Sequence, residues 1–133
     1  MPNAGCRMPS TALLVALALS MLAVGVPYWQ VPYAALSLPN ALLGVGLLVP
    51  LLATAAIRVV AGVPFLAAVG VGLAVPCVVA MRVVADVMGD PTSHNLWPFE
   101  VIIAGVVGLA VSVCGALLGG VVRLLTSPAA PPA

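Results

Sequence analysis

Three long stretches of this chain carry no charged side chain, and they constrain its fold more than any other feature. The first covers residues 8–57, between Arg7 and Arg58, and the others cover residues 59–81 and 101–122. An α-helix needs about 20 consecutive apolar residues to cross the hydrocarbon core of a bilayer. Only 5% of the residues are charged, whereas a soluble domain carries about 25%. The sequence therefore predicts an all-α integral membrane protein with almost no soluble mass.

Prolines divide these stretches into four predicted antiparallel spans. Pro27, Pro32 and Pro39 interrupt the first stretch, and a proline disfavours helix at the residue before it. The first stretch therefore holds two spans. The predicted spans are residues 8–26, 40–57, 64–84 and 98–122, and Pro39, Pro64 and Pro98 suit their first turns. Residues 1–125 form one four-helix domain in this interpretation, and the Pro/Ala-rich tail, residues 126–133, is expected to be disordered.

The arginines orient the spans. One side of the membrane receives three arginines and no acid: Arg7, Arg58 and Arg123. The other side receives one arginine and all three acids: Arg82, Asp86, Asp90 and Glu100. Because arginine in short loops marks the cytoplasmic face, both termini are predicted to be cytoplasmic. All four basic residues are arginine and Ala, Val, Gly and Pro are abundant, which is typical of a GC-rich bacterial genome and favours the cell inner membrane.

An alternative interpretation concerns the first span. Arg7 and the apolar run 11–26 resemble a secretory signal, with Ala23-x-Gly25 as a poor cleavage site. The run is long for a signal and Pro27 follows it closely, which favours a retained span. Cleavage would leave three spans in the same orientation.

Aromatic residues at the ends of the spans are predicted to anchor the protein at the two membrane surfaces. Trp and Tyr concentrate at the headgroup level of a bilayer, where one part of the ring system is apolar and another is polar. The candidates are Tyr28, Trp29, Tyr33 and Trp97.

A near-repeat occurs in the second and third spans. Gly44-Val-Gly-Leu-Leu-Val-Pro50 matches Gly70-Val-Gly-Leu-Ala-Val-Pro76 at six of seven positions. Pro50 and Pro76 are predicted to kink their helices, because each removes one backbone hydrogen bond. Paired Gly/Pro-broken helices point to the binding sites of transporters. In a chain this rich in Val, Gly and Leu, chance alone also explains the match.

Small residues recur at every fourth position of the last span. This spacing places side chains along one stripe of a helix, and small residues let two membrane helices approach closely. We therefore predict a helix-packing stripe, flanked by Gly115-x-x-x-Gly119 and formed by Ala104, Gly108, Ser112, Ala116 and Gly120.

The segment from Asp86 to Glu100 holds every acid and the single histidine of the chain. Asp90, His94 and Glu100 are weak candidates for a metal site, because carboxylate and imidazole ligands suit divalent ions. Structural roles account for the acids equally well. Asp90 before Pro91 is a good helix N-cap, Glu100 suits the first turn of a helix, and Asp86 follows Arg82 at the spacing of a helical ion pair.

No pattern in the sequence predicts a catalytic site or a cofactor, and a net charge of +1 offers no field for nucleic acid. The expected partners are the lipid bilayer and either other membrane subunits or further copies of the chain. The leading hypothesis is an accessory or assembly subunit of a larger membrane complex. The alternative is a small oligomeric transporter or channel that uses the Gly/Pro-broken second and third spans.

Overall fold

The computed structural model describes residues 8–92 and 95–127, which form helices and turns, with no strand in these two ranges. The α-helices are α1 (Met8–Gln30), α2 (Leu48–Val60), α3 (Phe65–Val69), α4 (Ala74–Gly89) and α5 (Trp97–Thr126). Three short 3-10 helices join them: η1 (Tyr33–Ala35), η2 (Val45–Leu47) directly before α2, and η3 (Gly70–Leu73) between α3 and α4.

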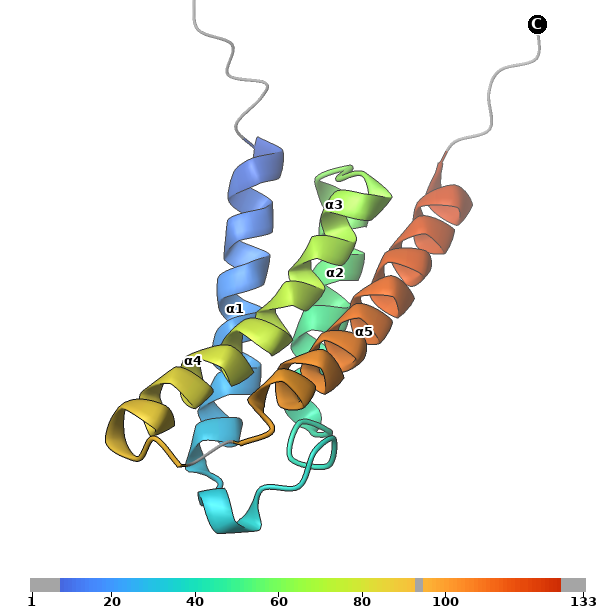
Figure 1. Ribbon diagram of the computed structural model, residues 1–133. Helices are drawn as coiled ribbons and strands as arrows, with labels where there is room; N and C mark the ends of the chain where they lie inside the picture. Colours follow the sequence, from blue (N-terminus) through green and yellow to red (C-terminus); the bar gives the residue numbers. More distant parts are fainter. Residues whose placement is uncertain (1–7, 93–94, 128–133) are drawn as a thin grey trace, which may run out of the picture.

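The chain runs back and forth through one bundle (Figure 1). Helix α1 descends in this view, α2 returns, the continuous rod α3–η3–α4 descends again, and α5 rises beside it. The beginning of α1 and the end of α5 therefore lie at the same end of the bundle. Helix α5 packs most extensively against α2 and also along η3 and α4, whereas α1 packs against α2 and α4.

Within the described residues, three helices are long and apolar enough to cross a membrane, which supports the predicted class of membrane protein. They are Ser10–Gln30, Phe65–Gly89 and Trp97–Thr126. The fourth apolar helix, Val45–Val60, is shorter. At about 1.5 Å per residue it measures roughly 25 Å, against a hydrocarbon core of about 30 Å.

The boundaries of the first two predicted spans differ from the observed helices. Helix α1 continues through Pro27 to Gln30 instead of ending at residue 26. The second helical segment begins at Val45, because residues 38–42 form turns that include Pro39. These turns place Leu42 in the core, where it packs with Val24 and is 4% exposed. Burial of this leucine favours the turn over an earlier start of the helix.

The last predicted boundary also moves. Helix α5 extends from Trp97 to Thr126, so the first residue of the predicted tail belongs to the helix. Residues 128–133 lie outside the described part of the chain.

The interior consists mainly of valine and alanine. One cluster joins α1, α4 and α5 near the end that contains Val24 and Val83, and a second joins the other ends of α1, α2 and α5 around Ala16 and Ala116. Two buried hydroxyl groups bond within their own helices. Ser20 donates to the Ala16 carbonyl at 2.7 Å and Thr54 donates to the Pro50 carbonyl at 2.6 Å. These hydroxyl groups are thereby satisfied without a polar path between helices.

Candidate functional site

The small-residue stripe of α5 faces the other helices. Its first four members are buried and Gly120 is half-buried. The side chain of Ser112 is fully enclosed, and its hydroxyl donates to the Leu109 carbonyl of the same helix at 3.1 Å. The stripe therefore presents almost no side-chain bulk or unsatisfied polar group to its neighbours.

The middle of the stripe meets η3 at Gly72. A Cβ atom added to Gly108 would collide with the carbonyl oxygen of Gly72, and one added to Gly72 would collide with the carbonyl oxygen of Gly108. The two backbones touch in both directions, which only glycine permits. Such close approach allows weak hydrogen bonds from Cα–H to carbonyl oxygen.

A second glycine pair of α5 fits against α2. A Cβ on Gly115 would collide with the carbonyl oxygen of Leu51, and a Cβ on Gly119 would lie 2.6 Å from that of Ala55. Gly120, by contrast, faces a side chain: a Cβ there would lie 3.2 Å from Nη2 of Arg58. The flanking pair Gly115 and Gly119 thus makes the backbone contact with α2, and the end of the stripe makes room for a guanidinium group.

The two copies of the near-repeat adopt the same local structure. In each copy a 3-10 turn passes into an α-helix, and the proline is the third residue of that helix: Pro50 in α2 and Pro76 in α4. A proline has no N–H, so the α-helical bond to the carbonyl four residues earlier cannot form. For Pro76 that carbonyl belongs to Gly72, and it lies against Gly108. The Gly72 carbonyl, which Pro76 leaves without an α-helical donor, is therefore covered by the backbone of α5.

The first copy uses its equivalent glycine in the same way. A Cβ added to Gly46 would collide with the carbonyl oxygen of Ala23 in α1. Ala23 precedes Pro27 by four residues, so this carbonyl also lacks its α-helical partner. Gly46 and Gly72 are the third residues of the two copies. Gly46 covers the Ala23 carbonyl, which lacks its α-helical donor because of Pro27. Gly72 carries the carbonyl that lacks its α-helical donor because of Pro76.

Arg82, a residue of α4, caps the C-terminal end of helix α1. Its guanidinium donates to the carbonyl of Tyr28 and, at 2.6 Å, to the carbonyl of Val31. Its Nε lies 3.4 Å from Oδ2 of Asp86, one turn further along α4. The side chain of Arg82 is only 8% exposed. A buried cation is thus surrounded by the carbonyls at the negative end of a helix and by one carboxylate, which compensates for its loss of hydration.

The predicted interface anchors differ in exposure. Tyr28 is 1% exposed, and the guanidinium of Arg82 lies 5.0 Å from the centre of its ring. The cation–π contact and the surrounding core hold the ring inside the bundle. Trp29 and Trp97 are about half exposed, at 49% and 52%. The side chain of Tyr33 lies outside the described part of the structure.

Asp90 and Glu100, two of the three candidate metal ligands, lie in different elements of the structure. Asp90 is exposed, and Glu100 lies in the first turn of α5. His94 lies outside the described residues. Among residues 8–92 and 95–127, no three His, Cys, Asp or Glu side chains come together. The described residues therefore give no geometric support for a metal site.

Asp90 stabilises a turn instead of starting a helix. Its Oδ1 accepts hydrogen bonds from the backbone N–H of Thr92 at 2.9 Å and from the Thr92 hydroxyl at 2.7 Å. These bonds lower the pKa of the Asp90 carboxyl, the hydroxyl bond contributing most. The N-cap type of hydrogen bond is present, but residues 91 and 92 form a turn.

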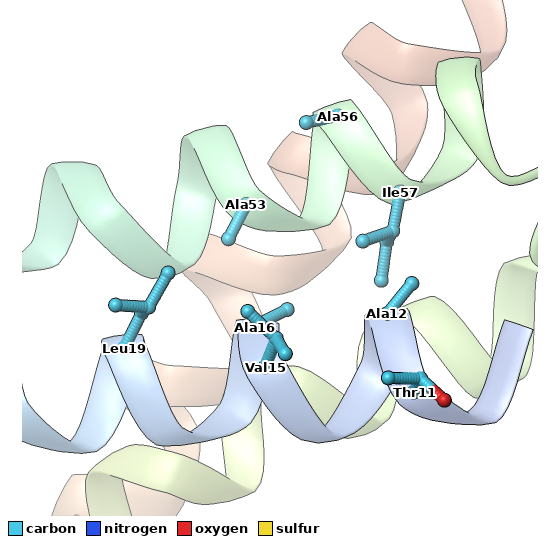
Figure 2. Close-up of a pocket in the computed structure, with 8 residues that line it drawn as sticks. All are labelled: Thr11, Ala12, Val15, Ala16, Leu19, Ala53, Ala56 and Ile57. Carbon is cyan, nitrogen blue, oxygen red and sulfur yellow. The ribbon is translucent and has the colours of Figure 1, made fainter. Parts of the chain in front are cut away.

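An apolar groove opens between α1 and α2 (Figure 2). Its volume is about 520 Å³. Figure 2 shows Ile57 pointing from α2 toward Ala12 of α1, with Ala53 facing the same gap. The walls are mostly alanine and aliphatic residues: Thr11, Ala12, Val15, Ala16, Leu19, Ala53, Ala56 and Ile57. Sequence reasoning missed this groove, because the small residues on its two walls are far apart in the chain.

The groove and the stripe differ in what covers them. The stripe on α5 is filled by α2 and η3, whereas the groove is lined by Ala56 and other residues that remain exposed. The groove is therefore open along its rim to another molecule. The chain matches no protein-family model, no curated protein and no solved structure.

Proposed function

We propose that this chain is a four-span accessory or assembly subunit that packs its α1–α2 groove against a transmembrane helix of a larger membrane protein. The groove is the observation that carries the proposal. Ala12 and Ala16 lie one turn apart on α1, and Ala53 and Ala56 line the opposite wall. Small residues on both walls allow a partner backbone to approach closely, which is the main source of helix association in a bilayer.

The path of the chain supports four membrane crossings. Helix α1 and the rod α3–η3–α4 descend in the same direction in Figure 1, so α2 has to bring the chain back between them. The turns before α2 complete its short span. The N–H of Leu42 bonds to the Pro39 carbonyl at 2.9 Å, and Leu42 is buried. Irregular backbone at membrane depth is tolerated where the protein itself satisfies and covers it.

The distribution of charge supports cytoplasmic termini. Arg58 and Arg123 lie at the ends of α2 and α5, on the same end of the bundle as the beginning of α1. Asp86 and Glu100 lie near the opposite end, at the end of α4 and the beginning of α5. Reporter fusions after Ala133 test this orientation. We expect activity from a cytoplasmic reporter, and activity from a periplasmic one would contradict cytoplasmic termini and favour an odd number of crossings.

The polar groups near the two prolines favour this proposal over transport. A transporter that used the Gly/Pro-broken helices would need a released carbonyl facing a polar path. The carbonyl of Gly72 instead lies against Gly108, and the hydroxyl of Thr54 donates to its own helix. The two copies of the repeat thus serve packing between helices.

Mild-detergent purification followed by mass spectrometry tests the accessory role. We expect the intact chain to retain a second membrane protein. Ala56→Leu, on the exposed rim of the groove, should release that partner, whereas Ala110→Leu on the exposed face of α5 should keep it. Both changes add the same side-chain volume to an exposed alanine. A pure homodimer with no other protein, unaffected by Ala56→Leu, would contradict the proposal and favour the oligomeric transporter.

A further inference from the structure

Two arginines converge on one turn at the end of the bundle where α2 and α5 finish. Nη1 of Arg58 donates to the carbonyl of Val63 at 3.2 Å. Nη1 and Nη2 of Arg123 lie 3.6 and 3.8 Å from the position that a Cβ atom would take on Gly62, the preceding residue. The two guanidinium groups therefore flank adjacent residues of the loop between α2 and α3. They are 65 positions apart in the sequence, so this proximity arises only through folding.

The arginines are held in place by the fold. The guanidinium of Arg58 lies 5.7 Å from the centre of the Phe65 ring and occupies the space left by the missing side chain of Gly120. Gly62 has a φ of 62°, a left-handed conformation that favours glycine. Arg123 lies at contact distance from this turn, and Gly120 leaves room for the Arg58 guanidinium.

No carboxylate side chain reaches this end of the bundle. All three acids of the chain are Asp86, Asp90 and Glu100. Glu100 and Arg123 are 23 residues apart on the same helix, which is roughly 35 Å at 1.5 Å per residue. Within the described residues, the guanidinium of Arg58 makes one hydrogen bond and its buried Nε makes none. The ends of α2 and α5 supply only partial negative charge, about half a charge each. The pair consequently retains an excess of positive charge.

Apolar side chains precede Arg123 on α5, toward the middle of the bundle. Leu117, Leu118 and Val121 are each more than half exposed. A phospholipid places its phosphate at the headgroup level and its acyl chains toward the bilayer centre, so it complements both the charges at the end of the bundle and this apolar surface.

We propose that Arg58 and Arg123 form a binding site for the phosphate group of an anionic phospholipid. Each arginine contributes N–H donors in a planar fork that matches phosphate oxygens. The phosphate reduces the repulsion between the two guanidinium groups, and the acyl chains cover Leu117, Leu118 and Val121. The site requires membrane insertion but does not depend on the accessory role, because it lies at the end of the bundle and away from the α1–α2 groove.

Native mass spectrometry of the full chain in mild detergent tests the site with two probes, phosphatidylglycerol and phosphatidylcholine of identical acyl chains. We expect the chain to retain phosphatidylglycerol preferentially, and Arg123→Gln to weaken that binding roughly fivefold. Arg123 is exposed, so this variant should fold. Asn95→Asp is the matched control. It changes the net charge by the same amount at the opposite end of the bundle and should leave lipid binding unchanged.

Three results would overturn the site. Unchanged binding of phosphatidylglycerol by Arg123→Gln would exclude a role for the arginine. An equal loss of affinity in Asn95→Asp would make net charge the cause. Displacement of the lipid by millimolar inorganic phosphate would identify a soluble anion as the ligand.

Discussion

The backbones of Gly72 and Gly108 are in direct contact, and the carbonyl oxygen of each occupies the space that a side chain on the other would need. This contact joins two separate features of the sequence, the Gly/Pro repeat and the small-residue stripe. Pro76 leaves the Gly72 carbonyl without an α-helical partner, and the stripe provides the surface that covers it. The proline and the distant glycine therefore act as one structural unit.

We expect Gly108→Ala to destabilise the protein by about 1–3 kcal/mol, because the added methyl group overpacks the contact with Gly72. Gly105→Ala is the matched control on the same helix, since no atom lies within 4 Å of its Cβ position. Replacing that glycine should stabilise α5 by about 0.5–1 kcal/mol through helix propensity. Denaturation in detergent, followed by circular dichroism, measures both. Equal stability of the two variants would show that the close contact has no energetic role.

The near-repeat provides an internal comparison between its first and third positions. Gly46→Ala and Gly72→Ala should each lower the stability by about 1–3 kcal/mol, because the new methyl group collides with a neighbouring backbone. Gly44→Ala and Gly70→Ala should be tolerated, since nothing lies within 4 Å of either Cβ position. Thermal unfolding of the four variants tests this pattern. Similar losses at all four positions would indicate a general requirement for glycine instead of two specific contacts.

The sequence predicts the class and the long helices because both depend on local composition. Charge-free runs and flanking prolines suffice to place three membrane-length helices within a few residues. The stripe on α5 is also visible, because its members recur at a helical spacing. Its neighbours are not visible. Gly115 contacts α2 and Gly108 contacts η3, and a single helix carries no information about which element covers each turn.

The features that the sequence analysis did not predict have tertiary causes. Helix α1 passes through Pro27, and its interrupted carbonyl at Ala23 is covered by Gly46, a residue of another helix. Tyr28 is buried, and Arg82, 54 positions away, stacks on its ring. Both outcomes depend on contacts between distant residues, which local rules for proline and tyrosine do not include.

The turn at Asp90 should show a measurable dependence on Thr92. Hydrogen bonds from Thr92 lower the pKa of the Asp90 carboxyl below its ordinary value of 3.8. A depressed folded-state pKa stabilises the turn above the unfolded value, and this contribution is lost as the pH falls through the folded-state pKa. Thr92→Val removes the hydroxyl, the larger cause, and should raise the pKa toward 3.8. A carboxyl titration by NMR measures the shift, and an unchanged pKa would exclude the hydroxyl bond.

Arg82 should be the charged residue on which the fold depends most. Arg82→Gln removes the cation at the end of α1. The Val31 carbonyl then loses its guanidinium donor, and the Tyr28 carbonyl keeps only the Val31 N–H at 3.3 Å. Loss of a buried, charged hydrogen-bond donor should cost about 3 kcal/mol. Asp86→Asn should cost less than about 1 kcal/mol, because this partner is 35% exposed and Arg82 retains both carbonyls.

Arg123→Gln provides the comparison for Arg82→Gln, since it removes the same charge from an exposed position. Its effect on unfolding in lipid-free detergent should stay within about 0.5 kcal/mol. The order of stability loss is therefore Arg82→Gln, Asp86→Asn and Arg123→Gln, measured under one set of conditions. If Asp86→Asn proved as damaging as Arg82→Gln, the ion pair would be the main source of stability. The helix-ending bonds to α1 would then contribute little, because Arg82 keeps them when only the carboxylate is neutralised.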